Sequence, residues 1–130
     1  MTAYKLRQIR NIFKSYPKIK LAYFFGSRAN GKAGPLSDYD FAVFIDGKDK
    51  KIFFDIRFSL MDKISRLLKT DNVDIVVLNL AESPELKYNI IKEGKLIYEK
   101  ELFRVIVEPK ILNEYFDFNF MLKKYNLTKV

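Results

Sequence analysis

The chain has 130 residues, 48% of them hydrophobic, which suits one compact domain over 1–130 and leaves little length for a second. It has no cysteine and no histidine, which excludes disulfides, thiolate metal sites and the commonest general base, so catalysis must use carboxylates, hydroxyls, lysines or arginines. The formal net charge of +8 favours an anionic partner, but it does not distinguish nucleic acid from nucleotide or from a merely lysine-rich surface.

The N-terminal half alternates helical and strand-like patterns. Apolar residues at steps of three and four predict a helix over 2–16, and Pro17 ends it. The apolar runs 19–25 and 38–45 predict two strands. Both runs are apolar enough for us to expect them at the centre of a sheet.

The C-terminal half continues the alternation. We expect a helix over 51–69, a strand over 73–78, a helix from Ser83-Pro84 to near Gly94, a short strand over 95–99, and a C-terminal helical segment within 101–130. Pro109 predicts a kink or a restart in that last segment. The fold class is therefore α/β or α+β, with helices packed on a small sheet. No apolar run approaches the roughly 20 residues that span a bilayer, and the start lacks a secretory signal, so we expect a soluble cytoplasmic protein.

Three acidic residues stand out in the strands. Asp38 and Asp40 are two residues apart, so they project from one face of a strand, roughly 6 to 7 Å apart at the α-carbons. Like charges this close are unfavourable unless a cation lies between them, and Mg²⁺ prefers such oxygen ligands. Asp74 is a lone acid in the apolar run VDIVVL, and it joins the pair if the two strands are neighbours. Two metal ions bridged by such acids would hold a nucleotide triphosphate and activate a hydroxyl.

A Gly-Ser turn follows the first predicted strand. Gly26 permits a close approach of the backbone, and Ser27 donates from its hydroxyl and its N–H, as phosphate binding requires. A short helix beginning in RANGKA would add its N-terminus to that site. Arg28 follows directly and is a candidate phosphate contact. Each feature alone is common in turns, and only their order along the chain indicates a nucleotide site.

The stretch FGSRANGKAGPLSDYDFAVF resembles the DNA polymerase β type nucleotidyltransferase superfamily, and more narrowly the minimal nucleotidyltransferases, or MNT proteins, encoded beside HEPN proteins. The resemblance extends through VDIVVLN, IIKEGKLIYE and YFDFNFMLKKY, nearly the whole chain. It implies the polymerase β type fold, with a small mixed sheet, flanking helices and no added domain for the acceptor.

The resemblance also implies a function and a set of site residues. Asp38 and Asp40 would bind two Mg²⁺ ions, Asp74 would complete the set and act as, or position, the general base, and Gly26 and Ser27 would hold the β and γ phosphates of ATP. MNT proteins are antitoxins that transfer AMP from ATP to a tyrosine hydroxyl of a HEPN ribonuclease toxin. The expected substrates are therefore Mg-ATP and a HEPN protein in a hetero-oligomer, and direct binding of nucleic acid is not expected.

Two alternatives stay open at this point. The protein is a binding antitoxin that masks its toxin sterically, or, less in keeping with its short chain, it transfers nucleotides to a small molecule or RNA. The aromatic run NEYFDFNFMLKKY (113–125) is either a docking surface for a partner or part of the domain's own core.

Overall fold

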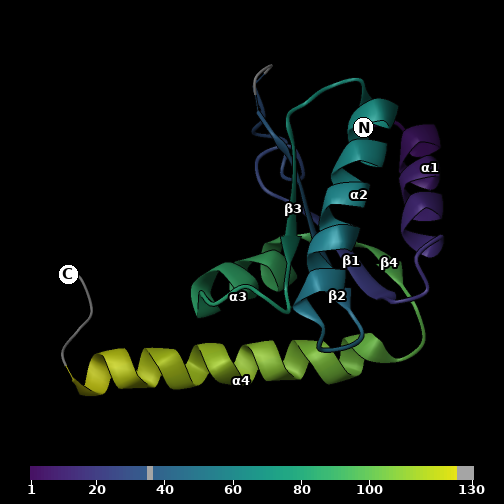
Figure 1. Ribbon diagram of the computed structural model, residues 1–130. Helices are drawn as coiled ribbons and strands as arrows, with labels where there is room; N and C mark the ends of the chain where they lie inside the picture. Colours follow the sequence, from purple (N-terminus) through teal and green to yellow (C-terminus); the bar gives the residue numbers. More distant parts are fainter. Residues whose placement is uncertain (35–36, 126–130) are drawn as a thin grey trace.

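The computed structural model describes residues 1–34 and 37–125 of the chain (Figure 1). Its elements in order are α1 (Ala3–Lys14), β1 (Ile19–Phe25), β2 (Tyr39–Ile45), α2 (Lys50–Leu68), β3 (Val73–Val77), α3 (Pro84–Glu93), β4 (Lys95–Glu99) and α4 (Phe103–Lys124). Each predicted helix and strand is present, with ends that differ by only a few residues. The last five residues of the predicted segment 101–130 lie outside the described residues.

Local sequence accounts for where the helices begin. The Thr2 hydroxyl accepts a hydrogen bond from the Lys5 N–H and caps α1. In α3, Ser83 caps the helix in the same way, and Pro84 occupies the first turn, where its missing N–H costs nothing. Within residues 1–34 and 37–125, none of the helices combines the length and the apolar character needed to cross a membrane.

The four strands form one mixed sheet in the order β3-β2-β1-β4. Strand β1 is antiparallel to both β2 and β4, whereas β2 and β3 are parallel. The expectation that the first two strands are central is confirmed. The same order makes β3 and β4 the edges of the sheet.

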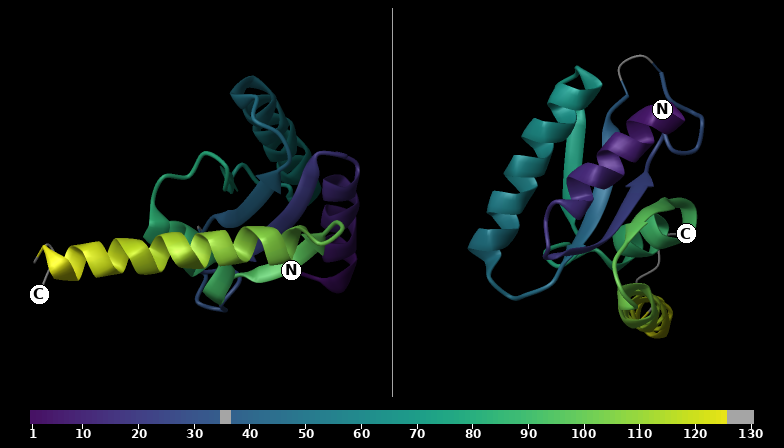
Figure 2. Two further views of the ribbon diagram at one scale, coloured as in Figure 1. Left: turned by 90° about the horizontal axis from the view of Figure 1, so that it is seen from below. Right: turned by 90° about the vertical axis from the view of Figure 1, so that its right-hand side faces the viewer.

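Helices cover both faces of the sheet (Figure 2). On one face, α1 and α2 pack through Phe13 and Leu60 on strand residues such as Phe41. On the other, α3 and α4 pack through Ile90 and Val107 on residues that include Ala42. Because side chains alternate along a strand, Asp40 lies on the same face as Ala42, which is the face of α3 and α4.

The prediction of a kink or restart at Pro109 is wrong. Helix α4 continues through Pro109, and it runs as one straight rod in Figure 1. A proline removes one hydrogen bond, to the carbonyl four residues earlier, and here that residue is Val105. Val105 is exposed, so water can satisfy its carbonyl. The helix is also tied to the sheet, because the Tyr23 hydroxyl donates a hydrogen bond of 2.6 Å to Glu108.

Candidate active site

Two of the three predicted acids lie side by side at the start of their strands. In the parallel pairing of β2 with β3, Asp40 is the register partner of Asp74. On its other side, Asp40 is the partner of Phe25, the last residue of β1. Asp40 therefore lies between the turn at Gly26 and the carboxylate of Asp74. The condition for Asp74 to join the other acids, that the two acid-bearing strands are neighbours, is met.

Asp38 directly precedes β2, two residues before Asp40. Its charge acts on Asp40, as described below, so the two carboxylates are within electrostatic range. In the part of the chain that the structure describes, no group of three acidic side chains is close enough to enclose an ion. The three acids are thus brought to one end of the sheet without forming a closed cage.

Gly26 is in tight contact with the carboxylate of Asp40. Its backbone has φ +81°, a conformation that side chains with a Cβ rarely adopt. A Cβ at this position would also meet Oδ2 of Asp40 at a distance that real Cβ atoms do not show. The position thus requires glycine for two separate reasons. One is its positive φ, and the other is the closeness of the Asp40 carboxylate.

The segment after Gly26 forms consecutive turns and no α-helix, so the conditional expectation of a short helix there is not met. The N–H groups of Ala29 and Asn30 both bond the Gly26 carbonyl, and the Lys32 N–H bonds the Ser27 carbonyl. These bonds fold the chain back immediately after β1. They hold the Ser27 backbone beside Gly26, at the same end of the sheet as Asp40.

The charges at this site are not balanced. Burial raises the pKa of Asp40, and repulsion from Asp74 and then from Asp38 raises it further. A carboxylate with a raised pKa beside two other acids is stabilised by a cation. The donor set consists of carboxylate oxygens, which are the ligands that Mg²⁺ prefers. On this observation the residues fit Mg²⁺, with Asp38, Asp40 and Asp74 as its candidate ligands.

Arg57 is a site residue that the sequence did not predict. Its Nη2 lies 3.4 Å from Oδ1 of Asp74, and its Nε donates a hydrogen bond of 2.7 Å to the Ile75 carbonyl. The arginine reaches from α2 to the edge strand β3 and restrains the carboxylate there. An indirect signal was present, because an acid in an apolar strand requires a cationic partner, but no spacing pointed to Arg57.

Arg28 links the residues that follow β1 to those at the start of β2. Its Nε donates a hydrogen bond of 2.8 Å to the Ser37 carbonyl, and its guanidinium lies 4.2 Å from the centre of the Tyr39 ring. These contacts connect the Gly-Ser turn to the start of β2. Contact between Arg28 and phosphate stays a prediction.

A mixed sheet that places a Gly-Ser turn beside two register-paired acids defines a nucleotidyltransferase domain. The chain belongs to the polymerase beta nucleotidyltransferase family, because the family described as "Polymerase beta, Nucleotidyltransferase" matches residues 7–102. The resemblance inferred from the Gly-Ser turn and the acids is confirmed at this level. The match includes the turn, all three acids and Arg57.

The chain is also similar to a protein adenylyltransferase and to solved toxin-antitoxin structures. It is 29% identical to the protein adenylyltransferase MntA of Aphanizomenon flos-aquae (strain 2012/KM1/D3) over 106 residues, which cover 76% of this chain and 70% of that protein. Several solved structures share its fold, two toxin-antitoxin structures among them. A toxin-antitoxin with AMP-PNP has TM-score 0.75 and 24% identity, covering 96% of this chain and 95% of that one. A tri-AMPylated Shewanella oneidensis HEPN toxin in complex with MNT antitoxin has TM-score 0.73 and 23% identity, with coverages of 96% and 95%.

Proposed function

We propose that this protein is an antitoxin that transfers AMP from Mg-ATP to a tyrosine hydroxyl of a cognate HEPN toxin and thereby inactivates it. The observation that carries the proposal is the register pairing of Asp40 with Asp74 beside Gly26. This arrangement supplies a cation site and a phosphate turn at one end of one sheet. The family, the adenylyltransferase relative and the fold shared with an MNT antitoxin agree with it.

The site residues have distinct roles in this transfer. Backbone N–H groups at Gly26 and Ser27 bind the β and γ phosphates, because the tight turn brings the main chain close to them. Asp38, Asp40 and Asp74 would hold Mg²⁺, which when bound neutralises triphosphate charge and polarises the α-phosphate. The tyrosine oxygen forms a bond to the α-phosphorus while the bond from that phosphorus to the bridging oxygen breaks. Asp74 takes, or positions the group that takes, the hydroxyl proton, and diphosphate leaves.

A protein acceptor also needs a docking surface, and α4 offers one. The run 113–125 contains no buried residue, and Phe116 and Phe120 are 56% and 68% exposed. Ring contacts of Tyr115 and Phe116 with Tyr88 and an ion pair of Glu114 with Lys87 tie this half of the helix to α3, but none of its residues is part of the core. It extends past the sheet in Figure 1, which leaves it accessible to a partner.

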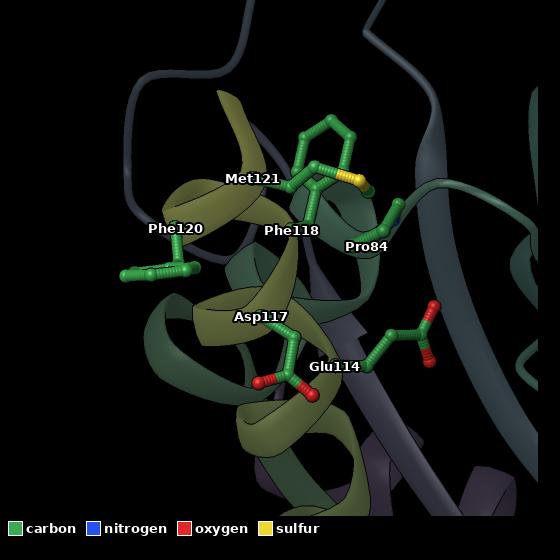
Figure 3. Close-up of a pocket in the computed structure, with 6 residues that line it drawn as sticks. All are labelled: Pro84, Glu114, Asp117, Phe118, Phe120 and Met121. Atoms are coloured by element: carbon green, nitrogen blue, oxygen red, sulfur yellow. The ribbon is translucent and has the colours of Figure 1, made fainter. Parts of the chain in front are cut away.

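A hollow of about 740 Å³ opens on this part of α4, between the helix and the start of α3 (Figure 3). Phe118 and Met121 point toward Pro84, while Phe120 points the other way. Asp117 and Glu114 form a charged margin, in which Glu114 pairs with Lys87 at 2.9 Å. An apolar centre with a charged margin is the usual composition of a protein interface. We assign this surface to the HEPN partner.

The test is incubation with labelled ATP, Mg²⁺ and the cognate HEPN toxin. Label is expected on the partner, and it should be lost when the double variant Asp38→Asn, Asp40→Asn replaces the unaltered protein. Equal labelling by the double variant would contradict the proposal. The steric alternative is favoured by the exposed surface of α4, and it predicts that the double variant still neutralises the toxin in cells.

A further inference from the structure

The order of the strands separates two sides of the candidate active site. The phosphate turn follows β1, Asp74 is on the edge strand β3, and Asp40 is on β2, between the turn and Asp74. In an in-line displacement, the attacking oxygen and the leaving diphosphate lie on opposite sides of the phosphorus. With the leaving group at Gly26, the attacking hydroxyl must therefore approach from the side of β3.

A cavity of about 470 Å³ lies on that side, and we call it the edge cavity. The edge cavity is formed by α2, β3 and the segment that leads into α3, and its lining includes Phe54, Arg57, Asp74, Leu80, Ala81 and Leu86. A second, smaller cavity adjoins Gly26, and only Leu86 is common to the two linings. Leu86 therefore separates a phosphate side from an acceptor side.

We propose that the edge cavity binds the side chain of the acceptor tyrosine, with its hydroxyl toward Asp74. This inference rests on the proposed function, and it specifies which part of the protein recognises the acceptor. Phe54 and Leu86 are 45% and 38% exposed, so apolar surface is available for an aromatic ring. Arg57 restrains Asp74 at the wall of this cavity, where the proton of a bound phenol would be transferred.

The edge of β3 favours a side chain over an added strand as the occupant. The backbone hydrogen bonds to β2 include those of Asn72 and Leu78, so they involve the even-numbered residues of β3. The backbone groups of residues 73, 75 and 77 therefore point away from β2. The outward carbonyl of Ile75 accepts from Arg57, and that of Val77 accepts from the Leu80 and Ala81 N–H groups. An incoming peptide strand would have to displace these bonds, whereas an aromatic ring does not.

The test compares variants of the edge cavity with matched exposed residues elsewhere. Phe54→Ala and Leu86→Ala remove apolar lining, and Ala81→Phe fills the cavity. Tyr4→Ala and Leu102→Ala are the controls, because both side chains are exposed and neither lines the edge cavity. Transfer from labelled ATP is measured against the concentration of the HEPN protein, and the KM for ATP is measured at saturating HEPN protein.

We expect each cavity variant to lower kcat/KM for the HEPN protein about tenfold or more, the loss typical of truncating an apolar anchor. The KM for ATP should stay unchanged in Phe54→Ala and Ala81→Phe, because neither residue lines the cavity beside Gly26. The controls should retain the full rate. Cavity variants that match the controls would overturn the inference, and so would a rise in the KM for ATP in Phe54→Ala or Ala81→Phe, because the nucleoside would then occupy the edge cavity. Absence of transfer by the unaltered protein would instead contradict the proposed function, and this inference would fall with it.

Discussion

Asp40 on β2 and Asp74 on β3 are partners in a parallel register, so two carboxylates face the same side of the sheet on adjacent strands. Like charges directly opposite each other on neighbouring strands destabilise a sheet, and Arg57 provides a cation beside Asp74 only. The raised pKa of Asp40, caused first by burial and then by these neighbours, records the same conflict. The repulsion between these acids therefore lowers the free energy of unfolding, and this effect can be measured.

Replacing Asp40 with Asn is expected to raise Tm at pH 7 in buffer without magnesium. The pKa of Asp40 is higher in the folded than in the unfolded protein, so the folded state is penalised above the folded pKa. This penalty fades as the pH falls toward the unfolded value of about 4. The Tm difference between Asp40→Asn and the unaltered protein should therefore be large at pH 7 and small near pH 4. Asp55→Asn, at an exposed position of α2, is the control, and a difference independent of pH would contradict the prediction.

Magnesium is expected to act on the same carboxylates. A ligand that binds only the folded protein raises Tm, so millimolar MgCl₂ should stabilise the unaltered protein in thermal denaturation. Chelation should reverse this gain. Asp38→Asn and Asp40→Asn should each lose most of the stabilisation, while Asp55→Asn keeps it. Equal stabilisation of all four proteins would place the ion elsewhere.

The contact between Gly26 and Asp40 can be isolated by a pair of substitutions. Gly26 and Gly31 have nearly the same φ, +81° and +78°, but a Cβ at Gly31 would meet nothing within 4 Å. Alanine at either position should therefore cost about 1 to 2 kcal/mol of unfolding free energy for the left-handed backbone. Only Gly26→Ala should also displace the Asp40 carboxylate and reduce AMP transfer, by about tenfold or more. Denaturant unfolding and labelled-ATP assays measure the two effects, and equal activity of the two variants would contradict this reading.

The parts of this site that the sequence predicted are those encoded by local pattern. Gly26 directly follows one strand and Asp40 lies at the start of the next, and the apolar runs of both strands are unambiguous, so their place at one end of the sheet followed from the strand predictions. The position of Arg57 depends on how α2 packs along the edge of β3, which no local spacing specifies. The straight course of α4 through Pro109 was missed for a related reason. Solvent at Val105 and the bond from Tyr23 to Glu108, both tertiary features, make the proline tolerable.

Arg57 is expected to matter for transfer more than for folding. Arg57→Gln removes the cation that lies 3.4 Å from Asp74, so the carboxylate loses its restraint beside β3. We expect transfer to fall several-fold, while the unfolding free energy changes by about 1 kcal/mol or less, as is usual for partly exposed ion pairs. Arg66→Gln is the matched control, because Arg66 forms a pair with Asp62 on the exposed side of the same helix. Similar transfer rates for the two variants would remove Arg57 from the candidate site.

The exposed half of α4 is expected to determine partner affinity without affecting the fold. Phe120→Ser and Met121→Ser change side chains that are 68% and 50% exposed, so the unfolding free energy should change by no more than about 0.5 kcal/mol. If this surface binds the HEPN toxin, the dissociation constant measured by calorimetry should rise about tenfold or more. Val105→Ser, at a 66% exposed position in the other half of α4, is the control and should leave the affinity unchanged.

The same variants separate masking from modification as the means of neutralisation. If masking alone neutralises the toxin, Phe120→Ser fails to neutralise it, whereas the double variant Asp38→Asn, Asp40→Asn still does. If modification is required, the double variant fails to neutralise the toxin, because the cation site is lost while the docking surface on α4 remains. Growth of cells that express the toxin with each variant reads out the difference, and our proposal requires that the double variant fail to rescue growth.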